Sequence, residues 1–169
     1  MTNDAYVQLM LHKRWADQEL CSAIADGLGR LDQSTDTYLR MIMDHIHSVD
    51  VIFQHHLTGR PHGYRAPRSD TLPDWDALFP QIRRLDDWFC EYAWSLPSAA
   101  WHEPLDFTFT SGRPARMRRD EILLHVSVHG TYHRGNAGVL LQQKALAPGR
   151  NSITDYLEDI DPVLDARTA

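Results

Sequence analysis

Hydrophobic residues recur every three or four positions over long stretches of the chain, a spacing typical of amphipathic helices. The first stretch covers about residues 3–28, contains no proline and ends among glycines. The second covers about residues 34–57, with Ser34 or Thr35 as the expected N-cap and Gly59 as the stop. Both stretches therefore predict long helices with one apolar face.

Two further stretches complete this helical pattern. Pro80 interrupts the third, so we expect a short turn and then a main helix over about residues 81–95. The fourth covers about residues 119–145 and ends before Pro148, and a short helix follows over residues 152–159. Four long amphipathic helices predict an all-α four-helix bundle.

A short segment before the fourth helix has a different period. Apolar and polar residues alternate over 105–110, which is typical of a β-strand, and Ser111-Gly112 forms a turn from which residues 113–117 can return. We therefore expect a small β-hairpin packed on the helices. Residues 59–68, rich in glycine and proline, predict an ordered loop. Neither repeats nor interior linkers divide residues 1–169, so the sequence predicts one domain.

The fourth helix carries the most informative chemistry. His129 and His133 are four residues apart, so they lie about 40° apart around the helix axis and one turn apart along it. That spacing lets one helix offer two nitrogens to one metal ion. Both histidines fall on the apolar stripe that includes Val126 and Ala137, so we expect them to point toward the interior.

The second helix supplies a third inward histidine. His45 follows Ile42 by three residues and precedes Val49 by four, whereas His47 lies roughly 200° away around the axis. His56 returns to nearly the face of His45, but about 16 Å further along the helix, so it cannot join a site centred there. We expect it to be an ordinary helix-end histidine near the negative end of the helix dipole.

The resulting histidine trio, His45, His129 and His133, suits a particular class of metal ion. Neutral imidazoles favour zinc, nickel or ferrous iron over magnesium or calcium. Three protein ligands leave a coordination position open, as in catalytic sites. The alternatives are satisfied histidines in a partly polar core, histidines on an exposed helix face, or a site in which His125 replaces His133.

Other residues within about a turn of the trio are candidates to orient its imidazoles. They are Asp50, His125, Tyr132, Arg134 and Asn136. Asp50 is also the one helix-borne carboxylate that we can place as a general base. Arg134 could steer an anionic thiol or pair with a carboxylate, and of these roles we favour the structural ion pair.

Composition limits the class of protein. Apolar residues make up 43% and charged residues 24%, as in globular proteins, and the net charge of −6 argues against nucleic-acid binding. No apolar run approaches the length of a membrane span, and the N-terminus does not resemble a signal peptide. Cys21 and Cys90 are expected to be unpaired thiols in a reducing cytoplasm. Ten histidines are an unusually high number for 169 residues.

Several motifs together resemble the DinB-like (YfiT-like) family of metal-dependent proteins. Residues 45–59 resemble that family's helix with H, four residues, D, and then L-T-G, and residues 125–135 resemble its H-V-x-x-H-x-x-x-H-R-G-Q helix. Residues 14–16 resemble its W-A-N start and residues 155–157 its tail. The similarity therefore extends over nearly the whole chain.

The resemblance implies a four-helix bundle in up-down-down-up order, commonly dimeric, with a divalent metal at the base of an open pocket. It also implies ligands at His45, His129 and His133, and so favours His133 over His125. Asn136 stands where the family usually has glutamine, and Tyr132 where histidine is frequent. Neither is a ligand position, so these departures bear on what orients the imidazoles.

The resemblance also suggests a reaction. Relatives include thiol-dependent S-transferases and a maleylpyruvate isomerase, which use low-molecular-weight thiols such as mycothiol or bacillithiol. The metal, zinc or nickel, would then bind the thiol sulfur as thiolate and activate it toward a small-molecule substrate. One alternative is a hydrolase that uses metal-bound water, and another is a noncatalytic protein that binds a metal or small ligand.

Overall fold

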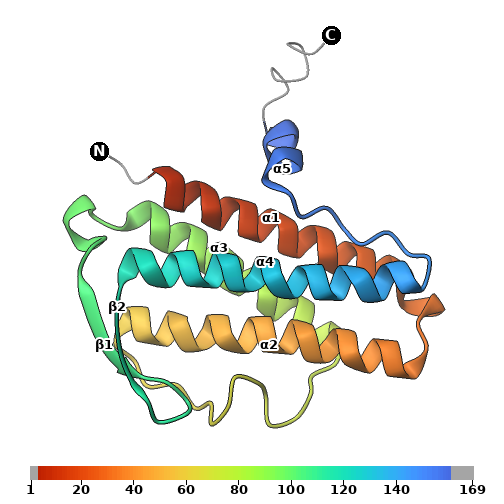
Figure 1. The fold of residues 1–169 in the computed structure, drawn as a ribbon, viewed down its shortest axis with the longest axis horizontal. Coiled ribbons are helices and arrows are strands. Elements are labelled where there is room, and N and C mark those ends of the chain that lie inside the picture. The colour runs from red at the N-terminus through yellow and green to blue at the C-terminus, as the bar shows by residue number, and fades with distance from the viewer. Residues whose placement is uncertain (1–3, 161–169) are drawn as a thin grey trace.

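The computed structural model describes residues 4–160, and four long helices dominate it (Figure 1). These are α1 (Asp4–Gly27), α2 (Gln33–Thr58), α3 (Trp75–Ser95) and α4 (Arg119–Gln143). The smaller elements are the 3₁₀ turns η1 (Leu28–Arg30) and η2 (Ser98–Ala100), the strands β1 (Pro104–Thr108) and β2 (Pro114–Arg118), and helix α5 (Ile153–Ile160). The predicted all-α fold is confirmed, including the hairpin before the last long helix.

The long helices form a bundle in which α1 and α2 each pack against both α3 and α4. Trp75, at the start of α3, donates a hydrogen bond to Asp36 in the first turn of α2, so these two helices begin at the same end. Arg119, at the start of α4, donates to the carbonyl of Leu57 near the end of α2. The helix order is therefore up-down-down-up, as the family resemblance implied.

The boundaries of α2 show one local error of prediction. Asp32 is the N-cap, and its carboxylate accepts a hydrogen bond from the backbone N–H of Thr35 at 2.9 Å, so the expectation of Ser34 or Thr35 as cap was wrong. Aspartate is an equally good cap, and its position here brings Thr35 into the first turn. Gly59 ends the helix as predicted, with a left-handed φ of 65°.

Helix α3 also differs from the prediction, because it continues through Pro80 from Trp75. Proline removes one backbone hydrogen bond, which leaves the carbonyl of Asp76 without its helical donor. Both residues are exposed, so water can hydrate that carbonyl. Trp75 and Leu78 are buried and hold the first turn of the helix against the bundle.

The hairpin pairs antiparallel, with Leu105 opposite Met117 and Phe107 opposite Ala115. Phe107 packs edge-on against Phe53 of α2 at 5.9 Å between ring centroids, so the hairpin covers one end of the bundle core. Within residues 4–160, none of the helices combines the length and apolar character needed to cross a membrane.

Candidate metal centre

The histidine trio converges from two neighbouring helices. The ligand atoms that His45 of α2 and His129 and His133 of α4 can offer all lie within 4.8 Å of one another. The ring centroid of His45 lies 4.9 Å from that of His129 and 4.6 Å from that of His133. The two rings on α4 are 4.5 Å apart. The trio could therefore hold a metal ion.

The orientation of His45 is set by the connection between α2 and α3. Its Nδ1 lies 2.7 Å from the backbone carbonyl of Pro67, and because a carbonyl only accepts, Nδ1 carries the proton. The neutral ring then has its lone pair on Nε2, which lies 3.1 Å from Nε2 of His129. A buried carboxylate, Asp44, holds the same connection in place by accepting from the backbone N–H and the hydroxyl of Ser69.

Burial keeps the imidazoles on α4 neutral. It lowers the pKa of His129 to about 3, with a further contribution from the neighbouring histidines, His133 first. Burial and then the proximity of His45 also lower the pKa of His133. A metal ion binds the neutral form of imidazole, so both side chains are in the form that can coordinate at neutral pH.

The other candidate residues on α4 differ in their packing and exposure. His125 packs against Phe53 at 4.7 Å between ring centroids and stacks on His129 at 5.5 Å. Tyr132 is 67% exposed and meets the ring of His133 edge-on at 5.0 Å. Asn136 is exposed to solvent. Nδ1 of His129 is buried and has no hydrogen-bond partner among residues 4–160, so packing between its neighbours orients this ring.

A cavity of about 640 Å³ lies beside the trio, between α2 and the connection that follows it. The lining residues come from α2 and from the connection after it, and they are Met41, Asp44, His45, Ala66, Pro67, Arg68, Ser69, Asp70 and Leu72. A volume of this size can hold a small organic molecule next to the trio.

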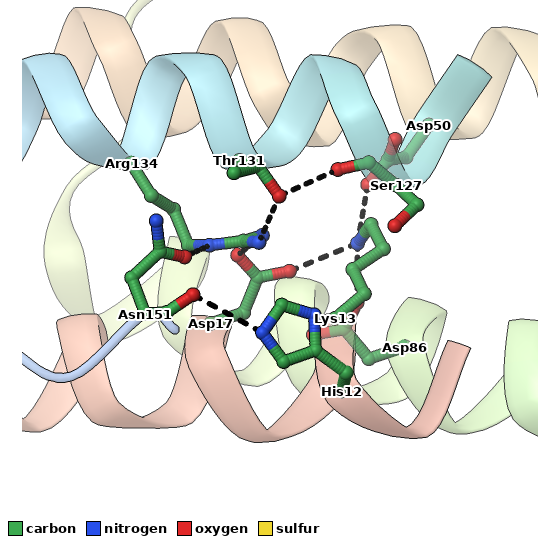
Figure 2. Close-up of polar contacts among 9 residues, drawn as sticks. All are labelled: His12, Lys13, Asp17, Asp50, Asp86, Ser127, Thr131, Arg134 and Asn151. Atoms are coloured by element: carbon green, nitrogen blue, oxygen red, sulfur yellow. Dashed lines mark hydrogen bonds and ion pairs between the residues drawn. The ribbon is translucent and has the colours of Figure 1, made fainter. Parts of the chain in front are cut away.

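Asp50 and Arg134 belong to a different structure in the centre of the bundle (Figure 2). Both take part in a buried ion network, here called the charged layer, which spans all four long helices. Its members are Lys13 and Asp17 of α1, Asp50 of α2, Asp86 of α3 and Arg134 of α4. Sequence reasoning had placed Asp50 and Arg134 near the trio and had not identified the other members.

Lys13 is the hub of the charged layer, with a side chain only 1% exposed. Its Nζ lies 2.9 Å from Asp17, 2.7 Å from Asp50 and 2.6 Å from Asp86. Arg134 donates to Asp17 at 2.9 Å and to the side chain of Asn151 at 2.7 Å, and so ties the segment before α5 to the bundle. This arrangement supports a structural role for Arg134.

The charged layer separates two apolar clusters of the core. On α1, Met10 belongs to one cluster and Leu20 to the other, and Lys13 and Asp17 lie between them. The sequence does contain an indication of the charged layer, because Lys13 and Asp17 share the inward stripe of α1 with these apolar neighbours. A lysine and an aspartate four residues apart are more often a surface pair, so the signal was not specific.

The carboxylates of the charged layer differ in their pKa. Burial raises the pKa of Asp86 well above its usual range and that of Asp50 to about 6. Burial also acts on Asp17, but the charges of Lys13 and Arg134 outweigh it and lower the pKa to about 2. Three acids face two bases, and the raised pKa of Asp86 favours the protonated form, which would balance the charge of the layer.

The fold and the trio together define a four-helix-bundle protein with a candidate three-histidine metal site. The model of the DinB family matches residues 1–162, and the chain belongs to this family. A solved structure, a DinB-like protein from Bacillus cereus ATCC 10987, is similar in fold with a TM-score of 0.66 and 17% sequence identity. The match covers 88% of this chain and 97% of that one. None of the curated proteins matches the chain significantly.

Proposed function

We propose that this protein is a metal-dependent S-transferase that uses zinc or nickel, held by the histidine trio, to activate a low-molecular-weight thiol. The observation that carries the proposal is the convergence of three imidazole donors within 4.8 Å from two helices. Three imidazoles suit a borderline divalent ion, and they leave at least one coordination position for a substrate atom. The resemblance to thiol-dependent members of the family supports the choice of thiol.

The residues around the trio fit this chemistry. A divalent ion bound there would lower the pKa of a coordinated thiol and so supply a thiolate at neutral pH. The carbonyl of Pro67 accepts from Nδ1 of His45, and this contact directs Nε2 at the trio. The cavity of about 640 Å³ beside His45 offers mostly apolar walls for the electrophile, and Arg68 supplies a positive charge at its edge.

A hydrolytic reaction is less well supported by the same geometry. A hydrolase of this kind needs a carboxylate or another base to take a proton from water. Asp50, the candidate for that role, has its Oδ2 2.7 Å from the ammonium of Lys13, inside the charged layer. The contacts of Asp50 therefore favour the thiol over water as the nucleophile.

The exposed face of α4 supports the further proposal of a homodimer. Leu124, Val128 and Tyr132 follow one another at intervals of four residues and are 43%, 59% and 67% exposed. An apolar row of this kind is typical of a protein–protein contact. Light scattering on purified protein should give twice the mass of the chain; a mass of one chain would contradict this proposal.

The activity can be tested with untagged protein reconstituted with zinc or nickel. We expect conjugation of 1-chloro-2,4-dinitrobenzene with at least one thiol from a panel of bacillithiol, mycothiol, glutathione and cysteine. A His129→Ala variant should lose the metal and the activity, whereas His102→Ala, whose side chain is 70% exposed, should keep both. Metal-loaded protein that is inactive with the whole panel would refute the S-transferase and leave a noncatalytic metal-binding protein.

A further inference from the structure

A second group of histidines lies near the C-terminal end of α2, away from the trio. His56 is on α2, and His62 is in the connection that follows. Their ring centroids are 5.2 Å apart, and the ring planes meet at 77°. Within the trio the corresponding distances run from 4.5 to 4.9 Å. The spacing of this pair is therefore close to that of imidazoles that could share an ion.

Both rings have a nitrogen without a partner. Nε2 of His56 and Nδ1 of His62 are buried and make no hydrogen bond to any atom of residues 4–160. Leaving a buried polar atom unpaired costs about 1–3 kcal/mol. Because the ring centroids are only 5.2 Å apart, we infer that a single bound species could serve as the partner of both nitrogens.

The surroundings hold these rings in place. His56 stacks on Phe107 of β1, with ring centroids 4.2 Å apart and planes at 23°. The neighbouring His55 contacts the carbonyl of Pro61 through Nδ1 at 2.8 Å, and this contact anchors the connection one residue before His62. A pair of donors that is already oriented loses little conformational freedom when it binds an ion.

The chemistry of this pair favours a transition metal. Burial, with smaller contributions from His62 and His55, lowers the pKa of His56 to about 4, so this ring is neutral at neutral pH. Two imidazole nitrogens suit zinc, nickel or copper better than magnesium or calcium. A cavity of about 410 Å³ adjoins the pair, and Asp106 and Thr108 also line it, so water or an oxygen ligand has room to complete the coordination.

We propose that His56 and His62 form a second site for a divalent transition metal, with solvent in the remaining coordination positions. This site is distinct from the trio, because His56 is eleven residues beyond His45 on α2, or about 16 Å along the helix. Two protein donors bind an ion less tightly than three, so the second site should fill after the trio.

Zinc stoichiometry tests the proposal. Untagged protein is dialysed against zinc-containing buffer, and bound zinc per chain is measured by elemental analysis, with circular dichroism as the check on folding. We expect two ions in the wild type, one in His62→Ala, one in the double variant His129→Ala/His133→Ala, which leaves the trio a single ring, and none in the variant that carries all three replacements. His62 lies in a connection, so its replacement leaves the helices intact; His102→Ala is the matched control and should keep both ions.

The histidine side-chain nitrogens provide a second readout. In ¹⁵N spectra, zinc should shift Nδ1 of His62 and Nε2 of His56 at higher zinc concentration than the trio requires. A wild type that binds a single ion, which His62→Ala keeps, would overturn the proposal, as would a His62→Ala variant that still binds two ions. A wild type whose single ion is lost in His62→Ala but kept in His129→Ala/His133→Ala would support this site and refute the trio as a metal centre.

Discussion

Replacing Asp86 by asparagine should stabilise the protein at neutral pH. Burial raises the pKa of Asp86 well above 3.8, so the folded protein holds a proton there that the unfolded chain releases. Each pH unit by which the folded-state pKa of Asp86 exceeds 3.8 corresponds to ~1.4 kcal/mol of stability that the wild type loses as pH rises toward neutral. Asparagine has the shape of the protonated acid, keeps an acceptor for Lys13 and binds no proton in either state.

The sign of the pH dependence follows from the raised pKa. The contribution of a protonated Asp86 to stability is complete below 3.8 and is lost as pH rises toward the folded-state pKa. Asp86→Asn should therefore be more stable than the wild type at pH 7, by ~1.4 kcal/mol for each pH unit through which the pKa of Asp86 is raised, and the gain should shrink to nearly zero near pH 4. Urea unfolding followed by circular dichroism at several pH values measures this difference.

Asp17→Asn is the matched control, because it removes a carboxylate that the charged layer needs in its ionised form. Asp17 accepts from both Lys13 and Arg134, and its loss leaves two buried cations short of a partner. We expect a loss of about 3–5 kcal/mol at pH 7. The reasoning would be refuted if Asp86→Asn were as destabilising as Asp17→Asn, or if its effect did not change with pH.

Two other predictions concern separate parts of the molecule. His129 should remain available to bind zinc at pH 6, because burial lowers its pKa to about 3 and the ring stays neutral there. ¹⁵N spectra that show His129 protonated and free of zinc at pH 6 would contradict this. Gly59→Ala should lower the free energy of unfolding by about 1 kcal/mol, because the φ of 65° at this position strains any residue with a Cβ. An unchanged midpoint of urea unfolding would contradict this prediction.

The three histidines of the trio lie together in the structure, as their helical phase predicted. His129 and His133 are one turn apart on the inward stripe of α4, and the apolar neighbours of His45 place it on the inward stripe of α2. Once α2 and α4 pack side by side, these faces must meet. The alternation over residues 105–110 was equally local, and the hairpin appears where it was expected.

Local pattern was insufficient where several side chains compete for one role. Asp32, Ser34 and Thr35 can each cap a helix, and the choice of Asp32 depends on which residues the first turn of α2 buries. Pro80 is an ordinary helix breaker, yet the burial of Trp75 and Leu78 against the bundle outweighs the one hydrogen bond that it removes.

The sequence alone therefore determined the helices, the hairpin and the inward phase of the trio, all of which follow from periodicity over a few residues. Tertiary structure alone decided that Lys13 contacts Asp86, 73 residues away, and that Arg134 contacts Asp17, 117 residues away. It also brought His62 against His56. The sequence around a charged or imidazole side chain does not indicate its distant partner. The packing of the four helices decides which of these side chains come into contact.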